Sequence, residues 1–153
     1  IDSVQKARSV LTLTGAAGVM IGRAAQGQLW LPGAIASALM AGDEHARTPA
    51  LTEQLRLQSD HLLRLHDFHG AHMGPRIARK HQAWLLESLT AQRVISAEDA
   101  RARRQAFNRL ESAEAQVECL GEEMTDALMS ASPATTSTIQ MSSQLCPQMS
   151  EAA

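Results

Sequence analysis

The segment Gly18-Val19-Met20-Ile21-Gly22-Arg23-Ala24-Ala25-Gln26-Gly27 joins a short apolar run to a turn of small residues. The run over 17–21 is almost uncharged and lies between glycines, which predicts a strand buried on both faces of a parallel sheet. After it, the open backbone at Gly22 and the forked cation of Arg23 are typical of a turn that binds phosphate. A glycine that only turns the chain, beside a solvated arginine, would give the same pattern, so both interpretations stay open.

The residues before this segment predict a helix that leads into the strand. Asp2 or Ser3 can cap a helix over 4–14, whose apolar positions recur every three or four residues, and Gly15 is a residue type that commonly ends one. A helix followed by a buried strand is half of a repeating α/β unit, but no second strand is predicted downstream. We therefore expect the neighbours of this strand to lie upstream of Ile1, as in a partial sequence.

The residues after the turn predict a second apolar helix, over 29–40. Pro32-Gly33 would break this helix, and Gly42 would close it. The polar residues 43–50 then predict a linker, because the composition changes after them.

The residues beyond the linker, 51–128, predict an all-α bundle whose first two helices are separated by Gly70. The first has an apolar stripe at Leu51, Leu55, Leu62, Leu65 and Phe68. The second begins near Pro75, a residue that helices tolerate best in their first turn. Its packing face is predicted to hold Ile77, His81, Trp84, Leu85 and Leu89. Its other face is basic, with Arg76, Arg79 and Lys80.

Two further helices complete the predicted bundle. Ser96 and the acid three residues later form a capping box for a helix that extends to about Phe107 and carries Arg101 and Arg104 one turn apart. The last helix, over 112–128, has acidic residues opposite its apolar stripe. Residues 129–153 contain too little apolar side chain to offset the entropy of ordering, which predicts a disordered tail.

The charged residues are segregated along the chain although the formal net charge is only -2. Residues 56–109 contain ten Arg and Lys against five acids, whereas residues 110–128 contain six acids and no Arg or Lys. Several cations on successive helices favour a nucleic-acid partner, with solvated helix surfaces as the alternative. Aromatic side chains are scarce, which favours recognition of the nucleic acid by shape and charge rather than by serial stacking.

Several classes of site and location are not expected. Five histidines lie within 61–81, but no acid or cysteine completes a familiar ligand set, so we expect solvated or RNA-facing histidines rather than a metal site. The apolar stretch 16–42 is interrupted by Arg23 and Pro32, so no membrane span is predicted. Two cysteines, Cys119 and Cys146, are too few for a disulfide framework, and the predicted location is the cytoplasm.

With these segments described, the chain resembles the C-terminal part of a bacterial tRNA-dihydrouridine synthase, and most of all the B-type members. The resemblance runs from Ile1 to about Leu128. It rests on Ile1-Asp2-Ser3, Val19-Met20-Ile21-Gly22-Arg23-Ala24-Ala25-Gln26-Gly27, Trp30, Arg76-Ile77-Ala78-Arg79-Lys80-His81, Trp84 and Phe107-Asn108. It implies that residues 1–42 are the last helix and strand of an FMN-binding (β/α)8 TIM barrel, and that residues 51–128 are an all-α tRNA-binding domain. It also implies reduction of uridine in tRNA to 5,6-dihydrouridine, with NADPH as the hydride source.

Carried over by position, the resemblance implies that Gly22 and Arg23 hold the FMN phosphate. Arg76, Arg79 and Lys80 match the basic helix of the tRNA-binding domain, and Arg101 and Arg104 are added to the RNA-binding candidates from their charge. The sequence departs from the family pattern at Gln28-Leu29, just after the turn, and at Leu85, where an aromatic residue is usual. The proton-donating cysteine and the flavin-contacting lysine of the family are expected upstream of Ile1, so no catalytic residue is assigned in this chain.

Two alternatives to a reductase portion stay open. The chain could be a non-catalytic helical RNA-binding or interaction module, or an inactive gene fragment that exposes the apolar faces of residues 4–40. Without the missing barrel portion, we expect the chain alone to bind FMN weakly or not at all and to be inactive.

Overall fold

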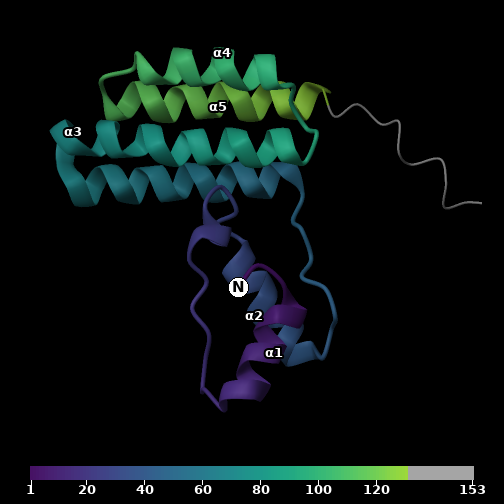
Figure 1. Cartoon of the computed structure of the whole chain (residues 1–153). Helices are drawn as coiled ribbons and strands as arrows, with labels where there is room; N and C mark the ends of the chain where they lie inside the picture. The colour runs from purple at the N-terminus through teal and green to yellow at the C-terminus, as the bar shows by residue number, and fades with distance from the viewer. Residues whose placement is uncertain (131–153) are drawn as a thin grey trace, which may run out of the picture.

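The computed structural model describes residues 1–130, with side chains as far as Glu122. The elements are α1 (Val4–Thr14), the 3-10 helix η1 (Arg23–Ala25), α2 (Leu31–Ala41), α3 (Leu51–Ala91), α4 (Ala97–Asn108) and α5 (Ala113–Ser130). Figure 1 shows α3, α4 and α5 as long parallel rods, with α1 and α2 grouped together to one side of them. Residues 129 and 130 belong to α5, and the rest of the tail that was predicted to be disordered lies outside the described residues.

The predicted strand over 17–21 is wrong, because no residue in 1–130 forms a β-ladder. A strand requires a neighbour that pairs with its backbone, and no such neighbour lies within the described part of the chain. The side chains of the segment still alternate: Val19 and Ile21 pack against the cluster between α1 and α2, whereas Met20 is 86% exposed. One face of the segment is therefore half-buried, whereas the sequence predicted two buried faces.

The two N-terminal helices end at glycines, as predicted. The Ser3 hydroxyl caps α1 by accepting a hydrogen bond from the Lys6 N–H, and Gly15 adopts the left-handed conformation (φ 65°). Gly42 ends α2 in the same conformation (φ 79°). The predicted break at Pro32-Gly33 is absent, because Pro32 lies in the first turn of α2, where its missing N–H is not needed. Within the part of the chain that the structure describes, no helix is long and apolar enough to cross a membrane.

The chain reverses at Gly70, in the middle of α3. This residue has φ 71° and ψ 175°, a left-handed geometry that favours glycine, and it divides α3 into two limbs. Figure 1 shows the limbs folded back side by side. Close behind the reversal, Gly74 packs on the other limb, because a Cβ at this position would lie 2.9 Å from the Cα of His66. The first predicted helix thus ends at the reversal, at Gly70, and the second begins just after it, near Pro75.

Polar side chains join the two limbs of α3 along their length, including Gln92, the residue that directly follows α3. The pairs are Gln54 with Gln92 (3.3 Å), Gln58 with Gln82 (3.4 Å) and His61 with His81 (2.9 Å). We call these three pairs the polar seam. An unsatisfied buried polar group costs about 1–3 kcal/mol, so sliding one limb past the other would be unfavourable where it separates buried partners such as Gln58 and Gln82. The polar seam therefore favours one register of the two limbs over others. Apolar contacts alone discriminate less between registers, because they are not directional.

The last two helices close the bundle over an apolar core. Leu62, Leu65, Ala78, Phe107 and Leu120 form one cluster of buried side chains, to which α3, α4 and α5 all contribute. A second cluster of Leu55, Leu85 and Leu89 lies nearer the open end of the two limbs. The separate cluster of Val4, Ala7, Leu31, Ile35 and Ala38 belongs to α1 and α2. Buried residues thus group separately on the two sides of 43–50.

A buried hydrogen-bond chain ties the reversal of α3 to α5. The His66 ring N–H donates to the side-chain oxygen of Gln116 (2.9 Å), and the amide nitrogen of Gln116 donates to the Pro75 carbonyl (3.1 Å). Gln116 is fully buried, with 0% of its surface exposed. One side chain of α5 therefore contacts both limbs of α3 next to the point where they reverse.

Phe68 does not lie on the packed face of α3, which corrects its predicted place in the apolar stripe. Its side chain is 83% exposed, whereas Leu62 is 0% exposed and Leu65 is 8% exposed. With 3.6 residues per turn, position 68 lies about 120° around the helix from position 62, so it falls outside the buried sector. The spacing of three residues from Leu65 to Phe68 is typical of one helix face. Measured from Leu62, however, the rotation about the helix axis carries Phe68 away from that face.

Candidate functional site

The predicted phosphate turn forms η1 and the residues beside it. Gly22 has φ -100° and ψ -106°, and its carbonyl accepts a hydrogen bond from the Ala25 N–H (3.0 Å). No atom lies within 4 Å of the place where a Gly22 Cβ would be, so the backbone is open on that side. Arg23 is exposed. The turn therefore presents an accessible guanidinium beside open backbone, a combination suited to an anion.

An open depression of about 570 Å³ lies beside this turn, between it and the first turn of α1. Its lining includes Arg23 and Lys6 as cations and Asp2 as a carboxylate. Lys6 and Asp2 form an exposed ion pair at 3.4 Å. The Lys6 charge lowers the pKa of Asp2 below its ordinary value, so Asp2 is ionised at neutral pH. One net positive charge is left, which favours an anion.

The far side of the turn packs directly on the second limb of α3. Gly27 is buried with φ 73°, and a Cβ at this position would overlap the backbone carbonyl of Trp84. Between the turn and α3 there is a small cavity of about 150 Å³, with Gly22 and Gly27 on one side and His61, His81 and Trp84 on the other. The predicted phosphate turn and the predicted RNA-binding helix thus meet at one place.

The two histidines of this cavity form a close pair. His61 Nε2 and His81 Nδ1 are 2.9 Å apart, and the His81 ring lies edge-on to Trp84 with 5.0 Å between ring centroids. Burial lowers the pKa of both imidazoles, and the charges of His61, Lys80 and His69 lower that of His81 further. A hydrogen bond between two rings requires at least one neutral imidazole, and the lowered pKa values favour that state.

The predicted RNA-binding residues of α3 do not all face solvent. Arg76 and Lys80 are exposed, and the Lys80 ammonium lies 4.7 Å from the centroid of the Trp84 ring. Arg79 is half-buried and donates to the Leu110 carbonyl (3.2 Å), so it holds the connection between α4 and α5. The sequence grouped the three cations on one face; the structure gives Arg79 a position at the edge of the core.

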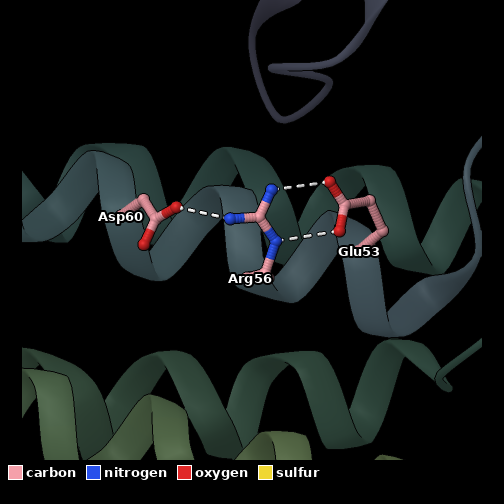
Figure 2. Close-up of polar contacts among 3 residues, drawn as sticks. All are labelled: Glu53, Arg56 and Asp60. Carbon is pink, nitrogen blue, oxygen red and sulfur yellow. Dashed lines mark hydrogen bonds and ion pairs between the residues drawn. The ribbon is translucent and has the colours of Figure 1, made fainter.

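The remaining cations differ in how far they are neutralised by nearby acids. Arg101 and Arg104 are exposed on α4, and Arg104 lies 3.7 Å from the Glu87 carboxylate of α3. Figure 2 shows Arg56 held between two carboxylates of its own helix, with Glu53 at 2.8 Å and Asp60 at 2.9 Å. Glu53 raises the pKa of Arg56 above its ordinary value, and Arg56 in turn lowers that of Glu53. Arg56 therefore adds little to the positive field of the bundle.

Sequence reasoning missed the contact between Gly27 and Trp84 and the pairing of His61 with His81. The one sequence signal for the first contact was the glycine at position 27, which ends the opening motif. Its left-handed conformation is seen only in the structure. Among the residues that the structure describes, no three His, Cys, Asp or Glu side chains are grouped so that they could hold a metal ion.

Comparison with known proteins identifies relatives over almost all of the described chain. A model of the dihydrouridine synthase (Dus) family matches residues 1–129. Relatives named tRNA-dihydrouridine synthase B occur in Pseudomonas syringae pv. tomato (48% identical over 118 residues), Vibrio cholerae serotype O1 (41% over 120) and Pseudomonas aeruginosa (43% over 116). These matches cover 76%, 78% and 76% of this chain, but only 32%, 34% and 32% of the relatives. The chain thus spans about a third of the length of these relatives, and the resemblance read from the sequence is confirmed.

Replacing Gly27 with Ala should separate the turn from α3. The left-handed backbone and the overlap with the Trp84 carbonyl together should cost about 1–3 kcal/mol. Hydrogen–deuterium exchange should then speed up over residues 22–30. Gly18→Ala is the matched control, because nothing lies within 4 Å of its Cβ position, and it should exchange as the unmodified chain does. Unchanged exchange in Gly27→Ala would show that the turn is not held by this contact.

The His61–His81 pair should make the stability of the chain depend on pH. Because burial lowers both pKa values, the neutral pair stabilises the fold fully above the ordinary value of 6.5, and this stability is lost as the pH falls through the lowered values. The Tm should therefore fall between pH 7 and pH 5, by about 2–4 °C for each kcal/mol lost. A double variant, His61→Gln with His81→Gln, should flatten this part of the profile, and His72→Gln, at an exposed position, should not. A flat profile in the unmodified chain would refute the assignment.

Proposed function

Because the chain belongs to the dihydrouridine synthase family, we propose that it is the C-terminal portion of an FMN-dependent tRNA-dihydrouridine synthase. The whole enzyme would reduce uridine in tRNA to 5,6-dihydrouridine with NADPH as reductant. The observation that carries this proposal, beyond the family match, is the contact between the phosphate turn and α3. Gly27, at the end of the turn that contains Gly22 and Arg23, packs on the helix that carries Arg76 and Lys80, so a flavin phosphate and an RNA backbone would be held by adjoining parts of one structure.

Residues 1–42 would be the closing part of a (β/α)8 barrel, with α1 as a barrel helix and 43–50 as the linker. The alternation at 19–21 supports this, because Val19 and Ile21 pack inward while Met20 is left exposed. Leu13 (85% exposed) and Met40 (90% exposed) add further uncovered apolar surface to the same unit. Neighbouring barrel strands and helices would cover such surface and would offer backbone partners to residues 17–21.

FMN would be held at its phosphate end. The exposed guanidinium of Arg23, the open backbone at Gly22 and the surplus positive charge of the depression fit a phosphate group. When bound, reduced FMN supplies the hydride that, together with a proton, saturates the C5–C6 double bond of uracil. No residue of this chain is assigned to give that proton. Cys119 is half-buried against the Leu62–Phe107 cluster, and Cys146 lies outside the described residues.

The tRNA would be held by the exposed cations of the bundle. Arg76 and Lys80 on α3, with Arg101 and Arg104 on α4, offer charge to the phosphate backbone. Arg79 would contribute to the field, but its guanidinium already donates to the Leu110 carbonyl. Its side chain therefore positions the α4–α5 connection more than it binds RNA.

Charge removal on α3 should weaken tRNA binding in a way that depends on salt. In a titration of the chain with tRNA at several salt concentrations, Arg76→Ala with Lys80→Ala should reduce the slope of log K against log[salt] by about 2. Arg56→Ala is the matched control, because Glu53 and Asp60 already neutralise this arginine, and its slope should change little. Equal effects of the two changes would contradict a specific role for Arg76 and Lys80.

The reaction itself is tested by deleting the gene in its host. Mass spectrometry of tRNA nucleosides should then show dihydrouridine lost from at least one position, and the intact gene should restore it. Full dihydrouridine at every position in the deletion strain would refute the reductase. Retained tRNA binding would then favour a non-catalytic RNA-binding module, since binding by charge does not depend on the flavin.

A further inference from the structure

Phe68 is the most exposed aromatic side chain of the helical bundle. It lies two residues before the reversal at Gly70 and is 83% exposed, whereas Phe107 is 1% exposed and Trp84 is half-buried. A phenyl ring left in water forgoes about 1.5–3 kcal/mol of burial, so a protected position inside the bundle would have been more stable. Neither the phosphate turn nor the cations of the proposed function involve this residue.

The surroundings of Phe68 indicate the chemistry of its partner. His69 packs edge-on against it, with 4.9 Å between ring centroids and planes at 86°, so one ring braces the other. Arg64 is exposed one helical turn earlier on the same limb. Arg76 is exposed on the second limb about level with Arg64, because Gly74 packs on His66 and the two limbs run in opposite directions. The one acid close in sequence is Asp67, which is also exposed. A flat apolar ring with cations around it suits a nucleobase whose phosphates are near those cations better than it suits an apolar protein surface.

We infer that Phe68, braced by His69, is a stacking platform for an unpaired base of tRNA, with Arg64 and Arg76 positioned for the adjoining phosphates. This inference rests on the proposed function for the identity of the RNA. Every base has a π-face, so stacking of this kind tolerates sequence and recognises a nucleotide that is not already stacked on both sides. The platform would give the bundle a contact that distinguishes a loop or end of folded RNA from continuous duplex.

The test compares tRNA affinities of the whole chain and three variants. Phe68→Ala should weaken binding about 5- to 150-fold, the range expected for losing one stacked base, and should leave the salt slope unchanged because no charge is removed. Phe68→Trp should retain the affinity. Leu63→Ala, which removes another exposed apolar side chain from the same limb (49% exposed), should change it less than 2-fold. The Tm of Phe68→Ala should match that of the unmodified chain, because the ring is not part of the core.

A fully paired RNA duplex provides the second arm of the test. The platform requires an unstacked base, so Phe68→Ala should bind the duplex as well as the unmodified chain does. An affinity for tRNA within 2-fold of the unmodified chain would overturn the inference while leaving the proposed function intact. An equal loss on tRNA and duplex, or a loss of self-association instead of RNA affinity, would overturn it as well. Salt-independent or absent tRNA binding by the unmodified chain would remove the proposed function and this inference together.

Discussion

The reversal of α3 at Gly70 is the constraint on which the rest of the bundle depends. A residue with a Cβ would be strained at φ 71°, and the close approach of Gly74 to His66 leaves no room for a side chain there. Once the chain has turned, the three pairs of the polar seam favour one register, because a shift of one limb along the other would separate all three pairs at once. Gln116 of α5 then bonds to both sides of the reversal, so the closing helix is positioned by the same feature.

The reversal also brings together the two parts of the candidate site. The first limb carries His61 and the second carries His81 and Trp84, and their pairing makes the surface on which the Gly22–Gly27 turn rests. A flavin phosphate at the turn and RNA at Arg76 and Lys80 would therefore be linked through a few packed side chains. In a flavoenzyme acting on folded RNA, such a contact would keep the cofactor and the RNA grip in a constant relative position.

The Arg and Lys side chains of this bundle fall into two groups that amino-acid composition cannot distinguish: some are held by other groups of the protein, and others are exposed. Arg56 is held by Glu53 and Asp60, and Arg79 supports the α4–α5 connection from a half-buried position. Arg76, Lys80 and Arg101 stand exposed, and Arg104 is exposed near Glu87. The field that a polyanion meets is thus weaker than a count of arginines and lysines indicates, and it is concentrated on fewer positions. A recognition element other than charge, such as an exposed ring at Phe68, gains importance for that reason.

The sequence by itself determined both ends of α1, the end of α2, the start of α4 and the family to which the chain belongs. Ser3, Gly15, Gly42 and Ser96 act through their own backbone geometry or through residues within one turn, and motif order along the chain needs no folding to be recognised. Only the tertiary structure decided that no strand forms at 17–21, that Phe68 faces solvent, and that Arg79 is tethered to Leu110. It also decided that Gly27 packs on Trp84, a residue distant from it in the sequence. Each of these depends on which distant segment lies opposite, and local periodicity carries no information about a partner 30 or 60 residues away, or about one that is missing.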